Sequence, residues 1–220
     1  MNRSKWPARA VLPFAQPGLK YIIVLILVTG MLFYAGWNPV AWFFLALTLF
    51  VCWFFRDPDR QGPEDADALV SPADGRVIIV EKQAKGQYIE GPCIKVSIFM
   101  NVFNVHVNRV PYDGVVQKVI YNPGKFVNAS FDKASIHNER NALIIKTSDG
   151  SEYAVVQIAG LIARRIVNCA QEGDCLKKAE RYGMIQFGSR LDLYLPPDFR
   201  AVVSVGDRTK AGTTIIGYMK

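Results

Sequence analysis

A stretch without any charged residue, from Tyr21 to Phe55, constrains the fold of this chain more than any other feature. Asn38-Pro39 interrupts the stretch and leaves two apolar legs, 21–37 and 40–55. Each leg is shorter than the roughly 20 residues that a helix needs to cross a bilayer core comfortably. We therefore expect a membrane-associated hydrophobic helical hairpin over 21–55, which either spans the bilayer thinly or enters one leaflet. A buried helix pair in a soluble protein is the alternative.

Positive charge flanks the apolar stretch on both sides. The basic residues are Arg3, Lys5, Arg9 and Lys20 before it and Arg56 and Arg60 after it. Because basic flanks stay on the cytoplasmic side, we expect both ends on the cytoplasmic face of the cell membrane, against an anionic lipid surface. The net charge of +7 does not indicate nucleic acid, since no basic cluster is interleaved with stacking aromatic residues.

The four cysteines form no C-x-x-C pair, so the sequence predicts free thiols in a reducing compartment and no metal site. They are Cys52, Cys93, Cys169 and Cys175.

The rest of the chain is expected to be mainly β. After a basic arm (1–20), the hairpin (21–55) and a proline-bearing linker (56–66), we place one soluble, β-sandwich-like domain over 67–220. Short β-branched runs predict its strands. These runs are 76–81, 94–99, 115–121, 142–147, 152–158, 161–167 and 213–218. Ser148-Asp-Gly-Ser151 predicts a hairpin turn between two of them.

Gly188-Ser189 lies between two apolar, β-like runs late in the chain. Alone, such a dipeptide is usually a turn. Five further segments precede it in order. They are Phe54-Phe-Arg-Asp-Pro58, Ser71-Pro-Ala-Asp-Gly75, Val105-His-Val-Asn-Arg-Val-Pro111, Tyr121 to Ala129, and Asn138-Glu-Arg-Asn141. Together with Phe187-Gly-Ser-Arg190 they resemble the phosphatidylserine decarboxylases, specifically the short, type A form of these pyruvoyl-dependent proenzymes.

The resemblance implies that the chain makes its own cofactor. The Ser189 hydroxyl would attack the Gly188 carbonyl, the chain would break into 1–188 and 189–220, and Ser189 would become a pyruvoyl group. The two products would stay together as a heterodimer. The amine of phosphatidylserine would form a Schiff base there, lose carbon dioxide and leave as phosphatidylethanolamine. Long members carry Leu-Gly-Ser-Thr where this chain has Phe-Gly-Ser-Arg, which we take as the mark of the short class.

The resemblance also assigns roles to His106 and Asp74. His106 would accept the Ser189 proton, which suits its near-neutral pKa. Asp74 would orient or charge the histidine. Long members carry two histidines here, whereas this chain has His106 and Arg109. By residue type alone, Arg109, Arg140 and Arg190 are candidates for the lipid phosphate. No catalytic role is expected for His137.

Two other classes of function stay open. Asp132-Lys-Ala134 resembles a lipoyl attachment triplet, so a biotinyl- or lipoyl-like carrier modified on Lys133 is one alternative. A membrane-anchored β module without enzymatic activity is the other. Within the enzyme class, a relative that acts on a serine-headed ether lipid is also compatible with the sequence.

Overall fold

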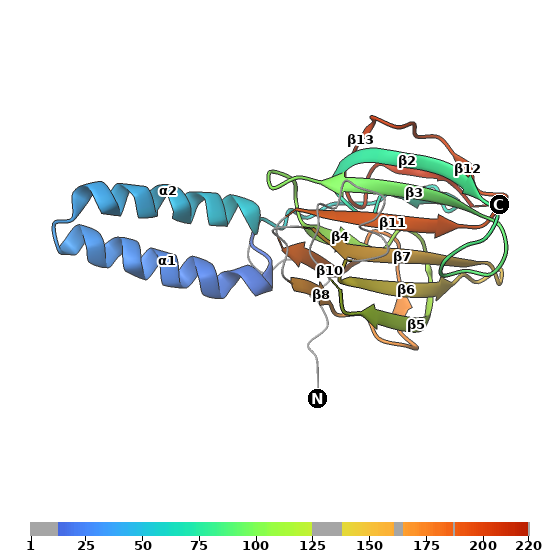
Figure 1. Cartoon of the computed structure of the whole chain (residues 1–220), viewed down its shortest axis with the longest axis horizontal. Coiled ribbons are helices and arrows are strands. Elements are labelled where there is room, and N and C mark those ends of the chain that lie inside the picture. The colour runs from blue at the N-terminus through green and yellow to red at the C-terminus, as the bar shows by residue number, and fades with distance from the viewer. Residues whose placement is uncertain (1–12, 125–137, 161–164, 187, 220) are drawn as a thin grey trace. The chain divides into compact units, whose positions relative to one another are not determined.

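The computed structural model describes residues 13–124, 138–160, 165–186 and 188–219. The chain divides into two compact units, residues 9–59 and residues 60–220. The first unit is helical and the second is built from strands (Figure 1). The expected fold class, a mainly β chain with two N-terminal helices, is confirmed.

The helical unit is a hairpin of α1 (Gln16–Tyr34) and α2 (Asn38–Phe54). A proline stands in the first turn of each helix, where its missing N–H costs nothing. α1 begins ahead of Tyr21, inside the segment expected to be a basic arm, because Pro17 supplies this start and the aliphatic stem of Lys20 does not oppose a helix. Gly36 adopts a φ of +75° in the connecting turn, so Pro39 starts the second helix after that turn.

Two buried threonines of the hairpin find their hydrogen-bond acceptors on the helix backbone. Thr29 and Thr48 each donate to a carbonyl of their own helix at 2.7 Å, and their hydroxyl oxygens lie 3.2 Å apart. Large apolar side chains such as Leu27 and Phe43 are exposed. α1 is long and apolar enough to cross a membrane, whereas α2 is a shorter apolar helix of 17 residues.

The second unit contains fourteen strands in the residues that the structure describes. They are β1 (Ala68–Val70), β2 (Gly75–Gln83), β3 (Cys93–Met100), β4 (Val107–Arg109), β5 (Gly114–Asn122), β6 (Arg140–Lys146), β7 (Glu152–Ala159), β8 (Arg165–Asn168), β9 (Cys175–Leu176), β10 (Arg181–Gln186), β11 (Ser189–Leu195), β12 (Arg200–Ala201), β13 (Arg208–Thr209) and β14 (Ile215–Tyr218).

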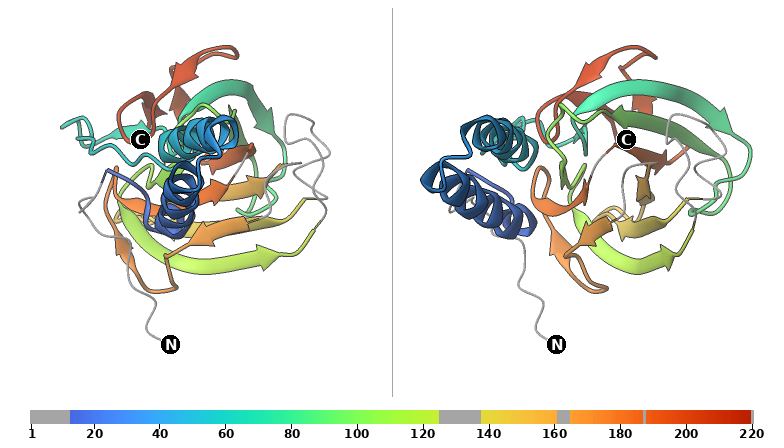
Figure 2. Two further views of the ribbon diagram at one scale, coloured as in Figure 1. Left: turned by 90° about the vertical axis from the view of Figure 1, so that its left-hand side faces the viewer. Right: turned by 60° about the vertical axis from the view of Figure 1, so that its left-hand side comes forward.

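The largest sheet is antiparallel, with the order β13-β2-β3-β11-β7-β6-β5-β9. It curls around an interior, as the right-hand view of Figure 2 shows. A sheet of order β4-β10-β8 and another of order β1-β14-β12 accompany it. Because successive side chains of a strand point to opposite faces, β11 sends Leu191 and Leu193 into the main core and Arg190 and Asp192 to the other face.

Six of the seven runs predicted as strands correspond to strands whose bounds differ by a few residues. For the seventh, 161–167, the strand is described from Arg165 onward. The hairpin turn at Ser148–Ser151 is confirmed: Thr147 N–H donates to the Ser151 carbonyl at 2.9 Å, and β6 pairs with β7. His106 lies directly before β4.

Candidate active site

The Gly188–Ser189 bond lies where the chain passes from one sheet to another. β10 belongs to the three-stranded sheet with β4 and β8, and Ser189 is the first residue of β11 in the eight-stranded sheet. Gly188 adopts a φ of +59°, a backbone conformation that other residues adopt at a cost. A Cβ at this position would meet nothing within 4 Å, so the backbone conformation rather than space favours glycine.

Ser189 is fully buried between two strand ends. Its register partners are Met100 on β3 and Ala159 on β7. The Ser189 hydroxyl points to the thioether of Met100, with Oγ 3.4 Å from Sδ. A thioether is a weak acceptor, so this contact leaves the hydroxyl oxygen little restrained.

His106 is fully buried next to the strand that leads to the Gly188–Ser189 bond. Its carbonyl accepts the backbone N–H of Ile185 on β10 at 3.3 Å. Nδ1 lies 2.9 Å from the carbonyl oxygen of Asn104. Because a carbonyl only accepts, Nδ1 carries the proton in this contact, and Nε2 is the basic nitrogen of the neutral ring.

Asp74 has partners other than His106. Its carboxylate pairs with the Arg60 guanidinium through both oxygens, with Nη2 2.9 Å from Oδ2. It also accepts the backbone N–H of Ala211 at 2.8 Å. Just before it, the Pro72 carbonyl accepts the backbone N–H of Arg109 on β4 at 2.9 Å. Asp74 therefore holds a turn that contacts β4, the strand that follows His106.

Of the three arginines suggested for the lipid phosphate, two lie in one row of the large sheet and the third, Arg109, lies on a strand of another sheet. Arg109 is buried and its guanidinium donates to the Ala179 carbonyl at 2.8 Å. Arg190 and Arg140 face Ile158 from its two neighbouring strands. They therefore lie in one cross-strand row, on the sheet face opposite to the Ser189 side chain.

That outer face carries a buried polar cluster. Arg190 Nε donates to Asp192 Oδ1 at 2.6 Å, and Nη2 donates to Ser97 Oγ at 3.0 Å. Lys95 Nζ lies 3.8 Å from the other Asp192 oxygen. Burial raises the pKa of the neighbouring Tyr194 phenol. Arg190 thus contributes to the packing of the sheet, and a charge balanced by Asp192 makes its burial tolerable.

A chain of buried amides crosses the interior below Ser189. Asn141 Nδ2 lies 3.5 Å from Gln157 Oε1, and Gln157 Nε2 donates to Asn108 Oδ1 at 2.9 Å. Asn108 Nδ2 lies 3.8 Å from Met100 Sδ, the atom that Ser189 also contacts. Glycine is required at position 183 chiefly by the paired strand, since a Cβ there would collide with the Val167 carbonyl oxygen and would also lie 3.1 Å from Gln157 Nε2. The inner face is therefore polar near the candidate site.

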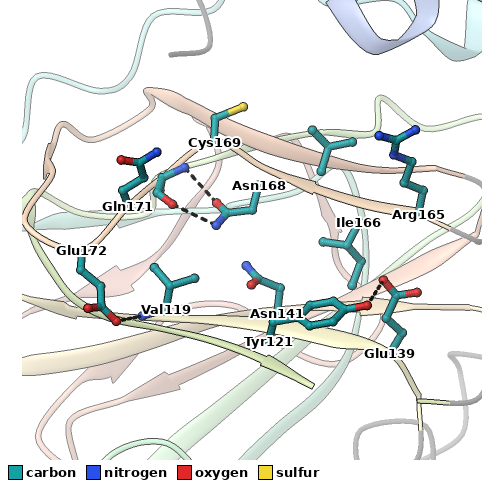
Figure 3. Close-up of a pocket in the computed structure, with 12 residues that line it drawn as sticks. Val119, Tyr121, Glu139, Asn141, Arg165, Ile166, Asn168, Cys169, Gln171 and Glu172 are labelled. Atoms are coloured by element: carbon teal, nitrogen blue, oxygen red, sulfur yellow. Dashed lines mark hydrogen bonds between the residues drawn. The ribbon is translucent and has the colours of Figure 1, made fainter. Parts of the chain in front are cut away.

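An open groove of about 1100 Å³ begins at the other end of this amide chain (Figure 3). One wall is formed by β5 and β6, and the other by β8 and the residues that follow it. The lining residues are Val119, Tyr121, Glu139, Asn141, Arg165, Ile166, Val167, Asn168, Cys169, Ala170, Gln171 and Glu172. Figure 3 shows Asn141 between the two walls, with the Tyr121 ring beside it. The segment Asn138–Asn141 is part of the family resemblance, but no motif in the sequence assigns a function to Glu139 or Asn141. A two-residue alternation that runs from Glu139 into β6 is the signal that would have placed both on one face.

Two residues discussed above, Lys133 and His137, lie outside the residues that the structure describes. The carrier hypothesis and the expected non-catalytic role of His137 therefore stay predictions.

Comparison with known proteins gives a consistent family. A family model described as phosphatidylserine decarboxylase matches residues 47–217. The chain is 50% identical over 204 residues to the phosphatidylserine decarboxylase proenzyme of Syntrophus aciditrophicus, covering 92% of this chain and 96% of that protein. It is 47% identical over 207 residues to the proenzyme of the same description from Desulfotalea psychrophila, covering 94% and 97%. The corresponding protein of Ralstonia pickettii is 50% identical over 205 residues, covering 93% and 95%.

Proposed function

Because the chain belongs to the phosphatidylserine decarboxylase family, we propose that Ser189 is the residue from which its pyruvoyl group is made. The protein is a proenzyme that converts phosphatidylserine to phosphatidylethanolamine, and its family uses a pyruvoyl group derived from a serine. The resemblance seen in the sequence is thus confirmed at the level of the family. Assignment to the short, type A class remains part of the proposal.

The observation that carries the proposal is the conformation of the Gly188–Ser189 turn. Gly188 has a positive φ, a conformation that glycine adopts with little strain, and no described atom would lie within 4 Å of a Cβ there. The adjacent hydroxyl contacts only the soft sulfur of Met100 in the hydrogen bonds described. The conformation and contacts of Gly188 and Ser189 are therefore compatible with formation of the pyruvoyl group from Ser189.

We assign His106 as the base of self-cleavage. Nε2 of the neutral ring can accept the Ser189 proton while Nδ1–H stays on the Asn104 carbonyl. The hydroxyl oxygen then bonds to the Gly188 carbonyl carbon and the peptide bond to Ser189 nitrogen breaks, which gives an ester. Elimination of the ester releases chain 1–188 with a carboxylate end. Hydrolysis of the remaining double-bonded residue releases ammonia and leaves chain 189–220.

Asp74 acts in this scheme as a positioning residue. Its contacts with Arg60 and Ala211 fix the turn 71–75, whose Pro72 carbonyl holds the backbone of Arg109. Because β4 starts directly after His106, a loosened turn would shift the imidazole relative to Ser189. This route differs from a catalytic triad, in which the carboxylate contacts the imidazole directly.

For turnover, the pyruvoyl group supplies a carbonyl that the substrate amine can join and that withdraws electrons as the carboxylate leaves. The residues of this chain form the environment of the pyruvoyl group at position 189. Met100, Ala159 and the inner-face core keep bulk water away from position 189. His106 is available to hold and return a proton. Arg109, Arg140 and Arg190 have partners within the protein, and a phosphate-binding role for any of them stays a prediction.

We also propose that the two cleavage products remain one heterodimer. β11 comes from the shorter product and pairs on both sides with β3 and β7 of the longer one, over seven and six register positions respectively. The expected domain limits, with the catalytic domain over 67–220, belong to the same proposal.

The hairpin would anchor the enzyme to the cytoplasmic face of the cell membrane. The support is the apolar surface of α1 and the basic residues at both ends of the stretch 21–55. Protease treatment of closed vesicles tests the face, since the β domain should be digested only when the cytoplasmic side is accessible. Recovery of the full-length protein entirely in the soluble fraction would exclude this anchor.

Two serine variants test the proposed cofactor residue. Ser189→Ala should remain a single chain without decarboxylase activity, because no hydroxyl is present to attack Gly188. Ser189→Cys should cleave slowly, since a thiol can make the same acyl shift. Decarboxylation at the normal rate by Ser189→Ala would exclude Ser189 as the source of the pyruvoyl group.

A further inference from the structure

Glu139 lies in the same cross-strand row as Ser189. Ser189 is paired with Ala159, and the Ala159 N–H donates to the Glu139 carbonyl at 2.9 Å, with Arg140 opposite Ile158 one position further on. The Cα atoms of Ser189 and Glu139 are therefore two strand spacings apart, about 10 Å. Residues opposite one another in a sheet point to the same face, so both side chains lie on the inner face. Only the methyl group of Ala159 stands between them in this row.

The Glu139 carboxylate belongs to the lining of the groove. It is half-buried, and the Tyr121 hydroxyl donates to its Oε1 at 3.1 Å (Figure 3). Among the described residues, no lysine or arginine is within ion-pair distance of it, and this includes Arg165, the one cation of the groove lining. Burial and the neighbouring Glu139 carboxylate both raise the pKa of Tyr121, which keeps this phenol a hydrogen-bond donor.

The groove suits an amine-bearing headgroup. Its second carboxylate, Glu172, accepts the backbone N–H of Val119 at 3.1 Å, which leaves Glu139 as the carboxylate on the Ser189 side. The Tyr121 hydroxyl oxygen, 3.1 Å from Glu139 Oε1, offers a second acceptor to an ammonium group bound there. The volume of about 1100 Å³ admits a phospholipid headgroup with part of its glycerol.

From this placement we infer that Glu139 is a substrate-binding residue that holds the ammonium group of the lipid headgroup beside position 189. This inference rests on the proposed role of Ser189. A lipid amine must approach the carbon that was Cα of Ser189, and it arrives as a cation at neutral pH. The Glu139 carboxylate, on the side of Ala159 away from Ser189, attracts that cation and orients it toward the reacting carbon. Lipids without an amine gain nothing from this carboxylate.

Binding to uncut protein tests the inference independently of the cofactor. In the Ser189→Ala background, short-chain phosphatidylethanolamine and short-chain phosphatidylglycerol are titrated as probes of the same chain length. Adding Glu139→Gln should weaken phosphatidylethanolamine binding about 10- to 100-fold, the worth of one charge-assisted contact, and leave phosphatidylglycerol binding unchanged. Adding Glu139→Asp should give an intermediate loss. The control Glu152→Gln changes an exposed glutamate at the far end of β7 and should alter neither affinity.

Activity of the otherwise wild-type Glu139→Gln protein gives a second readout. It should cleave itself normally, while KM for short-chain phosphatidylserine rises by a similar factor. Unchanged phosphatidylethanolamine binding, or equal weakening for both lipids, would overturn the role of Glu139. Absence of cleavage at position 188 in the wild-type protein would instead refute the proposed role of Ser189, and the binding result would still stand.

Discussion

The carbonyl oxygen of Asn104 lies 2.9 Å from Nδ1 of His106, the position that a carboxylate takes in a Ser-His-Asp triad. A neutral carbonyl fixes the tautomer of the imidazole without adding a charge to stabilise its protonated form. His106 can therefore act as a base through Nε2, with its tautomer fixed by the peptide backbone.

Loss of this histidine should slow maturation. General-base assistance is worth ~10²–10⁴-fold, so His106→Ala should accumulate uncut precursor during expression. The ratio of precursor to products on a denaturing gel, followed over time after synthesis is stopped, measures the rate. Normal cleavage and turnover in His106→Ala would show that the histidine is structural.

Asp74 should act through the turn that it holds. Asp74→Asn loses part of the paired contact with Arg60 and should cost about 1.5–3 kcal/mol of stability, as for hydrogen bonds to charged groups. It should also slow self-cleavage. Arg60→Gln should reproduce both effects, because the same contact is broken. Thermal unfolding and the cleavage rate are measured on the same samples. A cleavage defect in Asp74→Asn with none in Arg60→Gln would indicate a direct electrostatic effect on His106 instead.

Much of the fold could be predicted from the sequence, because local patterns determine it. The uncharged stretch with Asn38-Pro39 at its middle gives two helices, and β-branched runs give the long strands of the large sheet. The two-residue strands β9, β12 and β13 have no local signal, since only their partners in distant segments define them. The curl of the eight-stranded sheet likewise depends on the pairing of strands from distant segments, so no local pattern predicts it.

The candidate site was predictable where it depends on residue identity and not where it depends on tertiary contacts. Gly188 and Ser189 stand out by their position between two apolar runs. The pairing of Asp74 with Arg60, and the use of a backbone carbonyl by His106, involve contacts that no motif encodes. Arg190 could have been placed on the face opposite to Ser189 from the alternation of neighbouring residues alone. The same alternation would have drawn attention to Glu139.

The positive φ of Gly188, rather than the space around it, should determine how a substitution at this position affects stability. Gly188→Ala meets no atom within 4 Å but places a side chain at a φ of +59°, which costs about 1–2 kcal/mol. We expect a folded protein of slightly lower stability that cleaves more slowly, because the methyl group shields the carbonyl. Thermal unfolding and cleavage kinetics test both parts. Cleavage at the wild-type rate would mean that the glycine is not needed for the attack.

The buried amides should be needed for stability. Gln157→Leu leaves Asn108 and Asn141 without their partner in a fully buried position, and an unsatisfied buried polar group costs about 1–3 kcal/mol. The control Gln117→Leu changes an exposed glutamine on β5 and should have little effect. Denaturant unfolding of both variants gives the difference. Equal stability of the two would show that the amide chain is not a structural element.

Intact-mass measurement of the purified wild-type protein tests the central claim most directly. We predict two chains, 1–188 and 189–220, the second lighter by one ammonia than the same peptide with an N-terminal serine. Edman degradation should fail on the second chain, because a pyruvoyl end has no amino group. A single chain of full mass with full decarboxylase activity, or a second chain that begins with an unmodified serine in an active preparation, would contradict the proposed origin of the cofactor.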